Sequence, residues 1–321
     1  MEKISTTRSI AGNWTFAEMP PQHERSVVVT GTGGIGFHTA LELARAGAEV
    51  IIAGRNIHKG AEAIAKIRSA VPAANVRFER VDLASLESVA DFGARLRSQR
   101  GSLDVLINNA AVMNPPKRRE TADGFELQLG TNYLGHFALT AQLMPLLCEG
   151  AHPRVVTLSS IAARGGAIRF DDLQAERSYR PMRSYSQSKL ACLMFALELQ
   201  RRSEAGRWGV ASIAAHPGIS RTDLIHNGAG RRSFQGVARS LLWFLFQPAS
   251  HGAWPSLFAA TSPDARGGGY YGPAGFAEMR GAPTEAVIPK QALDVEAASR
   301  LWEISGRLSG VTIPASAWRL P

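Results

Sequence analysis

Residues 26–36 decide the fold of this chain, and they read Ser26-Val27-Val28-Val29-Thr30-Gly31-Thr32-Gly33-Gly34-Ile35-Gly36. The apolar run at the start is typical of a strand buried on both faces of a parallel sheet. A helical pattern through Leu41 and Leu43 follows the glycines directly. Glycines at such a turn let the backbone approach a pyrophosphate at a helix N-terminus, where free N–H groups and the helix dipole favour anions. The stretch therefore predicts a strand, a turn and a helix that together bind a dinucleotide.

The rest of the chain repeats this alternation of strand and helix. Further strands are expected at residues 49–53, 76–80, 103–108, 154–159, 210–215 and 269–272. Helical patterns separate them, including a long one over residues 125–149, and a terminal helix is expected over residues 293–308. Such alternation predicts an α/β fold, a doubly wound parallel sheet of the Rossmann type with about seven strands and helices on both faces.

The sequence contains no linker that would divide it, so we expect a single domain over residues 26–321. Residues 1–25 are interpreted as a leader packed on that domain, with Trp14 and Phe16 as its anchors. Residues 219–260 follow the sixth strand at the edge where open α/β sheets bind ligands, which predicts a substrate lid. The alternative for this segment is a pair of helices packed on the core. Residues 290–321 are interpreted as a C-terminal extension.

The net charge of +9 is spread over the sequence, and no basic run exceeds Lys117-Arg118-Arg119. Scattered arginines among acidic residues are more typical of a solvated surface than of a polyanion site, so we expect no nucleic-acid partner.

Two cysteines, Cys148 and Cys192, exclude a disulfide framework and a thiolate metal cluster, and no metal site is expected. The apolar run Leu241–Phe246 is far too short to cross a membrane. Residues 1–25 lack the apolar core of a secretory signal. We therefore expect a cytoplasmic protein without an integral membrane segment.

A second informative stretch is Arg183-Ser184-Tyr185-Ser186-Gln187-Ser188-Lys189-Leu190-Ala191-Cys192. Tyr185 and Lys189 lie four residues apart in a helical pattern, so they share one face. An ammonium beside a phenol favours the ionised form and lowers a pKa that is ordinarily about 10. Such a phenol can act as a general acid or base near neutral pH. Taken alone, the pair is more typical of a solvated helix face, so its meaning depends on the motifs that accompany it.

Those motifs are the glycine turn, Asn108-Asn109-Ala110-Ala111 after the fourth strand, Asn132 in the 125–149 helix, and Ser159-Ser160 at the end of the fifth strand. Ser160 lies 25 residues before Tyr185. In order and spacing the set resembles the classical short-chain dehydrogenase/reductase family, and within it the retinol-dehydrogenase-like branch. The resemblance covers nearly the whole chain.

The resemblance implies a catalytic role for four residues. Tyr185 would be the general acid in reduction and the base in oxidation, and Lys189 would lower its pKa and hold the nicotinamide ribose. Ser160 would bind the substrate oxygen, and Asn132 would anchor the water relay that resupplies the proton. The implied cofactor-binding residues are Gly31, Thr32, Gly33, Gly34, Ile35, Gly36, Asp82, Leu83, Asn109, Ala110, Ala111, Tyr185, Lys189, Pro217, Gly218, Ser220 and Thr222.

Two features bear on the choice of cofactor. Arg55 follows the second strand, where an acidic residue would bind a ribose 2′-hydroxyl, and Asn56 and Lys59 lie nearby. A guanidinium suits a 2′-phosphate, which favours NADP(H) over NAD(H), although NAD(H) stays possible. The glycine turn is also one residue shorter than the family pattern, because only Thr32 and Gly33 separate Gly31 from Gly34. The missing residue would normally help to hold the adenosine ribose or its phosphate.

We therefore expect an oxidoreductase that transfers hydride between NADP(H) and a ketone or aldehyde and its alcohol, with a bulky apolar small molecule as substrate. Two alternatives remain. The same four residues serve epimerisation, lyase chemistry or double-bond reduction in some members of the family, and a chain with a shortened turn could instead be a binding or regulatory module. The resemblance also implies a homodimer or higher homo-oligomer through the helices around Asn132 and Tyr185, unless residues 306–321 cover that surface.

Overall fold

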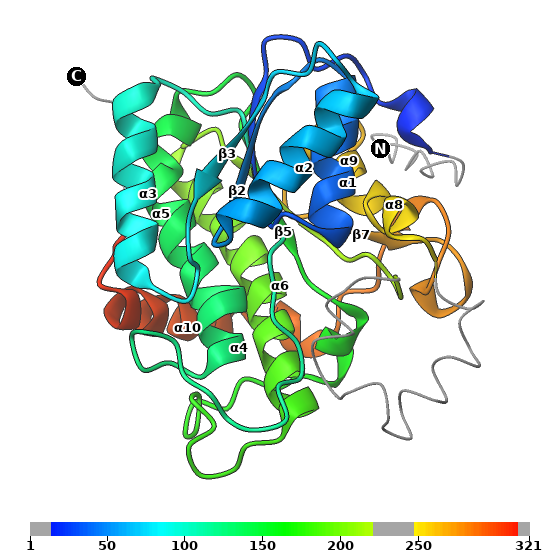
Figure 1. The fold of residues 1–321 in the computed structure, drawn as a ribbon. Coiled ribbons are helices and arrows are strands. Elements are labelled where there is room, and N and C mark those ends of the chain that lie inside the picture. The colour runs from blue at the N-terminus through cyan, green and yellow to red at the C-terminus, as the bar shows by residue number, and fades with distance from the viewer. Residues whose placement is uncertain (1–13, 221–246, 314–321) are drawn as a thin grey trace.

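Eight strands form one sheet in the computed structural model, which describes residues 14–220 and 247–313 (Figure 1). Their order across the sheet is β3-β2-β1-β4-β5-β6-β7-β8, and all neighbours are parallel except β7 and β8. The strands are β1 (Ser26–Thr30), β2 (Glu49–Gly54), β3 (Val76–Arg80), β4 (Val105–Asn108), β5 (Arg154–Leu158), β6 (Ala211–Ala215), β7 (Tyr270–Pro273) and β8 (Pro283–Glu285). The chain order reverses between β1 and β4, so a crevice is expected at the carboxyl ends of these strands.

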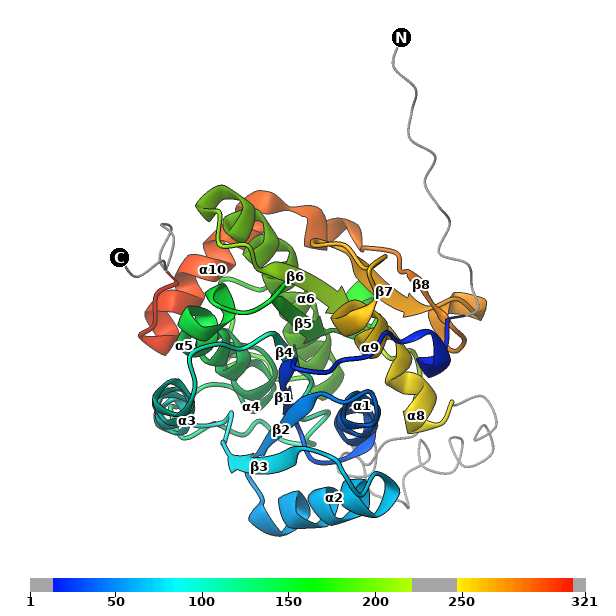
Figure 2. The same cartoon turned by 90° about the horizontal axis from the view of Figure 1, so that it is seen from above.

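Helices cover both faces of the sheet, as the view from above shows (Figure 2). One layer contains α1 (Gly34–Arg45), α2 (Ile57–Ala70), α8 (Ala249–Gly252) and α9 (Trp254–Thr261). The other contains α3 (Leu86–Gln99), α4 (Leu127–Leu129), α5 (Gly135–Cys148), α6 (Pro181–Gly206) and α10 (Val295–Ser309). Strands β1, β2 and β4 are buried on both faces because each layer packs against one side. The predicted α/β fold with a parallel sheet and helices on both faces is confirmed.

The eighth strand was not predicted. It has three residues, Pro283–Glu285, and pairs antiparallel with β7 at the edge of the sheet. So short a segment, opened by a proline and closed by a charged residue, lacks the apolar run from which the other strands were predicted.

The helix predicted over residues 125–149 is interrupted. A π-helical turn, η2 (Gly130–Leu134), separates α4 from α5. Asn132 lies in this turn, where its side chain accepts from the Val112 N–H at 2.7 Å and donates to the Val112 carbonyl at 3.0 Å. Two hydrogen bonds therefore connect the π-helical turn to the segment that follows β4. Such turns are frequent at functional sites.

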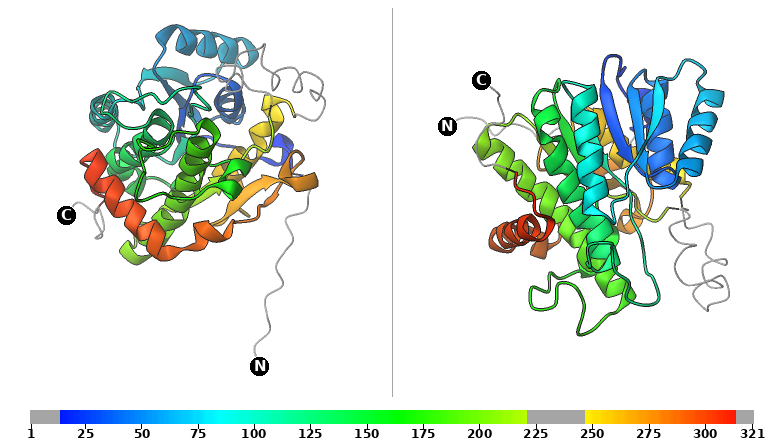
Figure 3. Two further views of the ribbon diagram at one scale, coloured as in Figure 1. Left: turned by 90° about the horizontal axis from the view of Figure 1, so that it is seen from below. Right: turned by 60° about the vertical axis from the view of Figure 1, so that its left-hand side comes forward.

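Helix α10 covers α5 and α6, and Figure 3 shows it running along their outer side (red against green). Trp302 stacks on Phe195 at 5.7 Å between ring centroids and meets Phe137 edge-on at 5.1 Å. The hydroxyl of Tyr133 lies 2.6 Å from the Ser305 hydroxyl. The surface implied for self-association is thus occupied by the chain's own α10, and the homo-oligomer stays a prediction that would need a different surface.

The segments at the start of the chain and after β6 are described in part. Trp14 is buried edge-on against Phe258, with 5.6 Å between ring centroids. Of the lid predicted over residues 219–260, residues 221–246 lie outside the described part of the chain. In the later part, Leu257 and Phe258 of α9 are buried against the sheet, which agrees with the alternative of a helix packed on the core. The lid itself stays a prediction.

Across residues 14–220 and 247–313, no helix combines the length and the apolar character that crossing a bilayer requires.

Candidate active site

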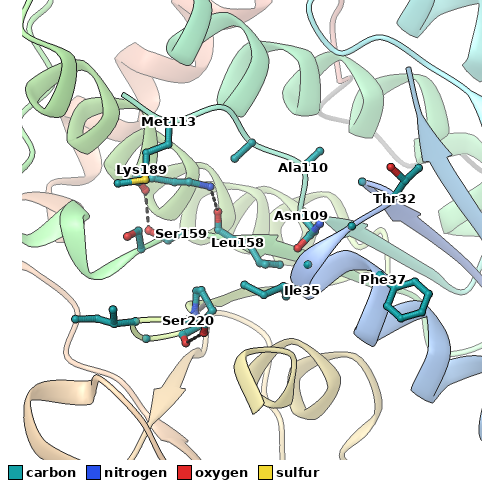
Figure 4. Close-up of a pocket in the computed structure, with 18 of the residues that line it drawn as sticks. Thr32, Ile35, Phe37, Asn109, Ala110, Met113, Leu158, Ser159, Lys189 and Ser220 are labelled. Atoms are coloured by element: carbon teal, nitrogen blue, oxygen red, sulfur yellow. Dashed lines mark hydrogen bonds between the residues drawn. The ribbon is translucent and has the colours of Figure 1, made fainter. Parts of the chain in front are cut away.

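A cavity of about 680 Å³ lies at the carboxyl ends of β1, β4, β5 and β6 (Figure 4). It contains these predicted site residues: Gly31, Thr32, Gly33, Gly34, Ile35, Asn109, Ala110, Ala111, Ser160, Tyr185, Lys189, Pro217, Gly218 and Ser220. Six predicted residues within the described part of the chain do not line it: Gly36, Arg55, Asn56, Asp82, Leu83 and Asn132. Thr222 lies outside the described residues.

The glycine turn is locked to the segment after β4. The Asn109 side-chain amide donates to the Thr30 carbonyl at 2.6 Å, and the backbone N–H of Asn109 and of Ala110 donate to the Thr30 hydroxyl at 2.8 and 2.9 Å. Gly31 has φ 101°, and a Cβ on it would lie 2.9 Å from the Asn109 amide nitrogen. A Cβ on Gly36 would lie 2.5 Å from the same nitrogen. Glycine is therefore required at both positions by conformation or space.

The short turn still presents a site for an anion. Helix α1 begins at Gly34, and Gly33 before it has no side chain with which to cap the helix. The first N–H groups of an α-helix have no intrahelical partner, so here they are left for a ligand at the cavity. A Cβ on Gly33 would meet nothing within 4 Å. These observations fit the pyrophosphate of a dinucleotide, despite the missing residue.

Tyr185 and Ser160 lie together at the other end of the cavity. Tyr185 lies near the start of α6, and Ser160 follows β5 and begins the 3-10 turn η3 (Ile161–Gly165). Burial raises the pKa of Tyr185 to about 12, and its hydrogen bond with the Ser160 side chain acts in the opposite direction. The phenol therefore holds its proton firmly in this structure.

Lys189 lies one helical turn after Tyr185, but its ammonium is directed elsewhere. Its Nζ donates to the Leu158 carbonyl at 2.9 Å, and the Ser159 hydroxyl donates to the Lys189 carbonyl at 2.7 Å (Figure 4). Burial lowers the pKa of Lys189 itself. We expected Lys189 to lower the pKa of Tyr185, but in this arrangement burial of the phenol is the larger effect and raises that pKa. The Lys189 ammonium instead binds the carbonyl at the end of β5.

Asn132 lies behind the cavity. Besides holding Val112, its amide donates to the Ser188 hydroxyl at 2.9 Å. Its backbone carbonyl oxygen accepts from His136 Nδ1 at 2.9 Å and from the Cys192 thiol at 3.2 Å. Burial lowers the pKa of His136 to about 4, so this imidazole is neutral at pH 7. Asn132 therefore positions the segment after β4, and its role in a water relay stays a prediction.

The residues predicted to bind adenosine are engaged locally or exposed. Asn56 caps α2 by accepting the Lys59 N–H at 3.0 Å. Asp82 accepts the Ala84 N–H at 3.0 Å, and Leu83 is buried. Arg55 is exposed. The cavity extends instead along α2.

Sequence reasoning left several lining residues unassigned. These are Phe37, Lys59, Glu62, Ala63, Lys66, Met113, Leu158, Ser159, Ile161, Ala162, Met182 and Ile219. Those from α2 recur at intervals of three or four, so a helical projection of residues 57–70 would have placed them on one face. Ile161 and Ala162 directly follow Ser160, but nothing in their residue type points to a site.

Known proteins similar to this chain are dehydrogenases. The family model for short chain dehydrogenases matches residues 25–231. The polyprenol dehydrogenase of Mus musculus is 40% identical over 310 residues, covering 94% of this chain and 89% of that protein. Retinol dehydrogenase 13 of Homo sapiens is 40% identical over 296 residues, covering 91% of this chain and 86% of that protein.

A solved structure agrees. An uncharacterised protein from Mycobacterium paratuberculosis is 38% identical, with a TM-score of 0.77, and the match covers 94% of this chain and 99% of that one. Together with the glycine turn, Ser160, Tyr185 and Lys189 around one cavity, these matches establish that the chain belongs to the short-chain dehydrogenase family, whose members use NAD(P)(H) to act on CH–OH groups.

Proposed function

We propose that this enzyme interconverts a bulky apolar alcohol with its aldehyde or ketone and that NADP(H) is its preferred cofactor. The observation that carries the proposal is the arrangement of the cavity, which has a glycine turn suited to pyrophosphate at one end and Ser160 with Tyr185 at the other. A dinucleotide and an alcohol carbon would therefore meet within one enclosed space.

The chemistry of this chain is proton transfer and positioning. When bound, the nicotinamide supplies or accepts the hydride. Ser160 would donate a hydrogen bond to the substrate oxygen, and Tyr185 would give that oxygen a proton in reduction or take one in oxidation. With a pKa of about 12, the phenol is protonated at pH 7, which suits the reductive direction. Oxidation requires a lower pKa, and the ammonium of Lys189, one turn later on α6, would be the charge that lowers it.

The substrate class is inferred from the lining of the cavity and from the relatives. Side chains of Met113, Ile161, Met182 and Ile219 give the end near Tyr185 an apolar wall. Relatives at 40% identity are named for polyprenol and retinol, which are both isoprenoid alcohols. An isoprenoid alcohol or aldehyde would bury its chain against such a wall, with its oxygen at Ser160.

The preference for NADP(H) is supported by the cations near the glycine turn. Arg55 is exposed at the end of β2, and Lys59 and Lys66 line the cavity from α2, with Glu62 between them. A 2′-phosphate next to these groups would gain charge-assisted hydrogen bonds that a 2′-hydroxyl lacks. NAD(H) is the alternative.

The test is a panel of isoprenoid and short-chain alcohols, aldehydes and ketones, each assayed with both cofactors by the absorbance of the reduced nicotinamide. We expect the highest kcat/KM with an isoprenoid alcohol or aldehyde and NADP(H). Loss of turnover in Tyr185→Phe serves as the control that the signal comes from this site. Turnover of epimerisable or unsaturated compounds in place of alcohols would favour the alternative chemistries, and preference for short polar alcohols would overturn the substrate class.

A further inference from the structure

The carboxylate of Glu278 joins two segments that line the cavity, although Glu278 itself lies behind them. Its Oε2 is 2.7 Å from His216 Nε2 and 2.6 Å from a terminal nitrogen of Arg164. Its Oε1 accepts the Val287 N–H at 3.0 Å. Arg164 belongs to η3, which begins after Ser160, and His216 directly precedes Pro217 at the cavity. One carboxylate therefore connects the turn that carries Ser160 with the segment expected to contact the nicotinamide.

The hydrogen bonds define the protonation of His216. Its Nδ1 accepts the N–H of Gly218 at 3.2 Å, so the ring proton is on Nε2 and is donated to Glu278. The imidazole is only 1% exposed, and a Cβ on Gly272 would lie 2.0 Å from Nε2, so the ring has no space to turn. A second proton, on Nδ1, would face the Gly218 N–H and break that bond.

The backbone next to Glu278 makes a second connection to the same segment. The Met279 carbonyl accepts the Ile219 N–H at 2.9 Å. Gly218 has φ 64°, and a Cβ on it would lie 2.3 Å from the Met279 carbonyl oxygen. Ala277 and Glu278 have φ values of 51° and 59°, which are unusual for residues with side chains. Such conformations persist where the surroundings enforce them, and they are frequent at functional sites.

We propose that Glu278 is a positioning residue, which fixes the distance between Ser160 and the Pro217–Ser220 segment by binding Arg164 and His216 together. It touches neither substrate nor cofactor, and it acts through the two residues that it binds. The consequence for catalysis rests on the proposed function, whereas the effect on the backbone of residues 217–220 does not.

The charges around His216 predict how the connection responds to pH. Glu278, Arg164 and the ring of Tyr270, 5.2 Å away, face the imidazole. Burial lowers the pKa of His216 below its ordinary value, and Glu278 acts in the opposite direction. Burial by itself would raise the pKa of Glu278, but its bonds with His216 and Val287 hold the pKa below its usual value. Because the pKa of His216 lies below its ordinary value, acidification beyond the ordinary histidine range should protonate His216 and release Gly218, while Glu278 remains ionised.

The experiment compares Glu278→Gln with Glu285→Gln, an exposed carboxylate on the adjacent β8. Amide hydrogen exchange in the ligand-free protein is read at Gly218 and Ile219. We expect exchange at these amides to be faster by about tenfold or more in Glu278→Gln and unchanged in Glu285→Gln. With substrate and cofactor, we expect kcat to fall about tenfold to a hundredfold in Glu278→Gln, because a small displacement of the reacting groups is enough.

A matched pair at His216 tests the pH response. His216→Asn keeps an acceptor near the Gly218 N–H but has no proton to gain, whereas His216→Gln keeps a donor toward Glu278. The protection of the Gly218 amide, which is its exchange rate compared with the intrinsic rate at the same pH, should fall in the natural protein as the pH drops below the ordinary histidine range. In His216→Asn this protection should not depend on pH. Equal exchange and equal kcat in Glu278→Gln and the natural protein would overturn the proposal. Faster exchange at Gly218 in a protein that binds no dinucleotide would support the positioning role and count against the proposed function instead.

Discussion

The ammonium of Lys189 donates a hydrogen bond to the carbonyl oxygen of Leu158, with 2.9 Å between the two atoms. A second bond, from the Ser159 hydroxyl to the Lys189 carbonyl, fixes α6 against the end of β5 at the same level. Ser160 is the next residue along the chain, and Tyr185 lies one turn earlier on α6. These two bonds therefore set the position of Tyr185, the proposed proton donor, relative to Ser160, which is proposed to bind the substrate oxygen.

Tyr185→Phe should lower turnover by about 10²–10⁴, the range expected when a general acid is removed. Binding of the dinucleotide should change little, because the pyrophosphate site at the glycine turn is at the other end of the cavity. Turnover and a fluorescence titration with NADPH measure the two effects separately. Tyr179→Phe is the matched control, because its hydroxyl bonds to the Pro115 carbonyl outside the cavity. Normal turnover in Tyr185→Phe would remove the assignment.

Lys189→Met should shift the pH dependence of alcohol oxidation upward. Burial already raises the pKa of Tyr185 to about 12, and a positive charge nearby favours the phenolate. Removing that charge leaves the phenol protonated up to a higher pH, so the rising limb of the oxidation rate moves to more basic values. Reduction needs the protonated phenol and should be affected less. If the limb stays in place and activity is retained, Lys189 acts through its bond to Leu158 and not through its charge.

Much of the fold could be predicted because its strands are continuous apolar runs. β3 has the predicted bounds, and β2 is longer than predicted by Gly54 alone. The π-turn at Asn132 could not be predicted, since it depends on Val112, a partner 20 residues away in the sequence. The bond between His216 and Glu278 also joins residues far apart in the sequence, 62 positions, so local sequence patterns could not predict it.

That several of the predicted site residues line one cavity could be expected from the sequence. Ser160, Tyr185 and Lys189 meet in the cavity because their motifs end β5 and begin α6. Asp82 and Leu83 lie outside the cavity. The Asp82 carboxylate accepts the Ala84 N–H, a local bond that the residue type did not reveal. The two interpretations of residues 247–260 could not be separated from the sequence, because an apolar helix over a cavity and an apolar helix on a sheet have the same composition.

Gly36→Ala should destabilise the turn. The new Cβ would lie 2.5 Å from the Asn109 amide nitrogen and 2.8 Å from the Gly31 carbonyl oxygen, so one of them must move. Overpacking of this kind costs about 1–3 kcal/mol, which denaturant unfolding measures. Gly33→Ala is the control for stability, because its φ of −138° suits alanine and its Cβ would meet nothing within 4 Å. Equal stability of the two variants would contradict the packing argument.

Trp302→Ala should destabilise the protein by about 3–5 kcal/mol, as is typical for removal of a buried tryptophan. It removes the contacts of α10 with Phe137 and Phe195 and with the Arg202 guanidinium, which lies 4.6 Å from the ring centroid. Once α10 is loosened, α5 and α6 expose apolar side chains, so sedimentation should show increased self-association. Glu303→Ala, an exposed neighbour on the same helix, should change neither. A Trp302→Ala protein of natural stability would show that α10 contributes little to the fold.

The choice of cofactor is tested by two cations at different places. Arg55→Asp should weaken NADP(H) by about tenfold or more and relatively favour NAD(H), since a charge-assisted bond contributes about 1.5–3 kcal/mol. Lys59→Met should act in the same direction if the 2′-phosphate lies on the side of α2 that lines the cavity. Lys117→Asp, on an exposed loop, is the control for net charge.

The ratio of the Kd values for NADPH and NADH, measured by fluorescence at several salt concentrations, distinguishes the outcomes. A change in Arg55→Asp alone places the phosphate at the end of β2, where an exposed guanidinium binds it and salt weakens the contact strongly. A change in Lys59→Met alone places it within the cavity along α2, where screening is weaker. If neither variant alters the ratio, the preference for NADP(H) is wrong. The first N–H groups of α1 would then remain as the anion site, and they bind the pyrophosphate of either cofactor equally.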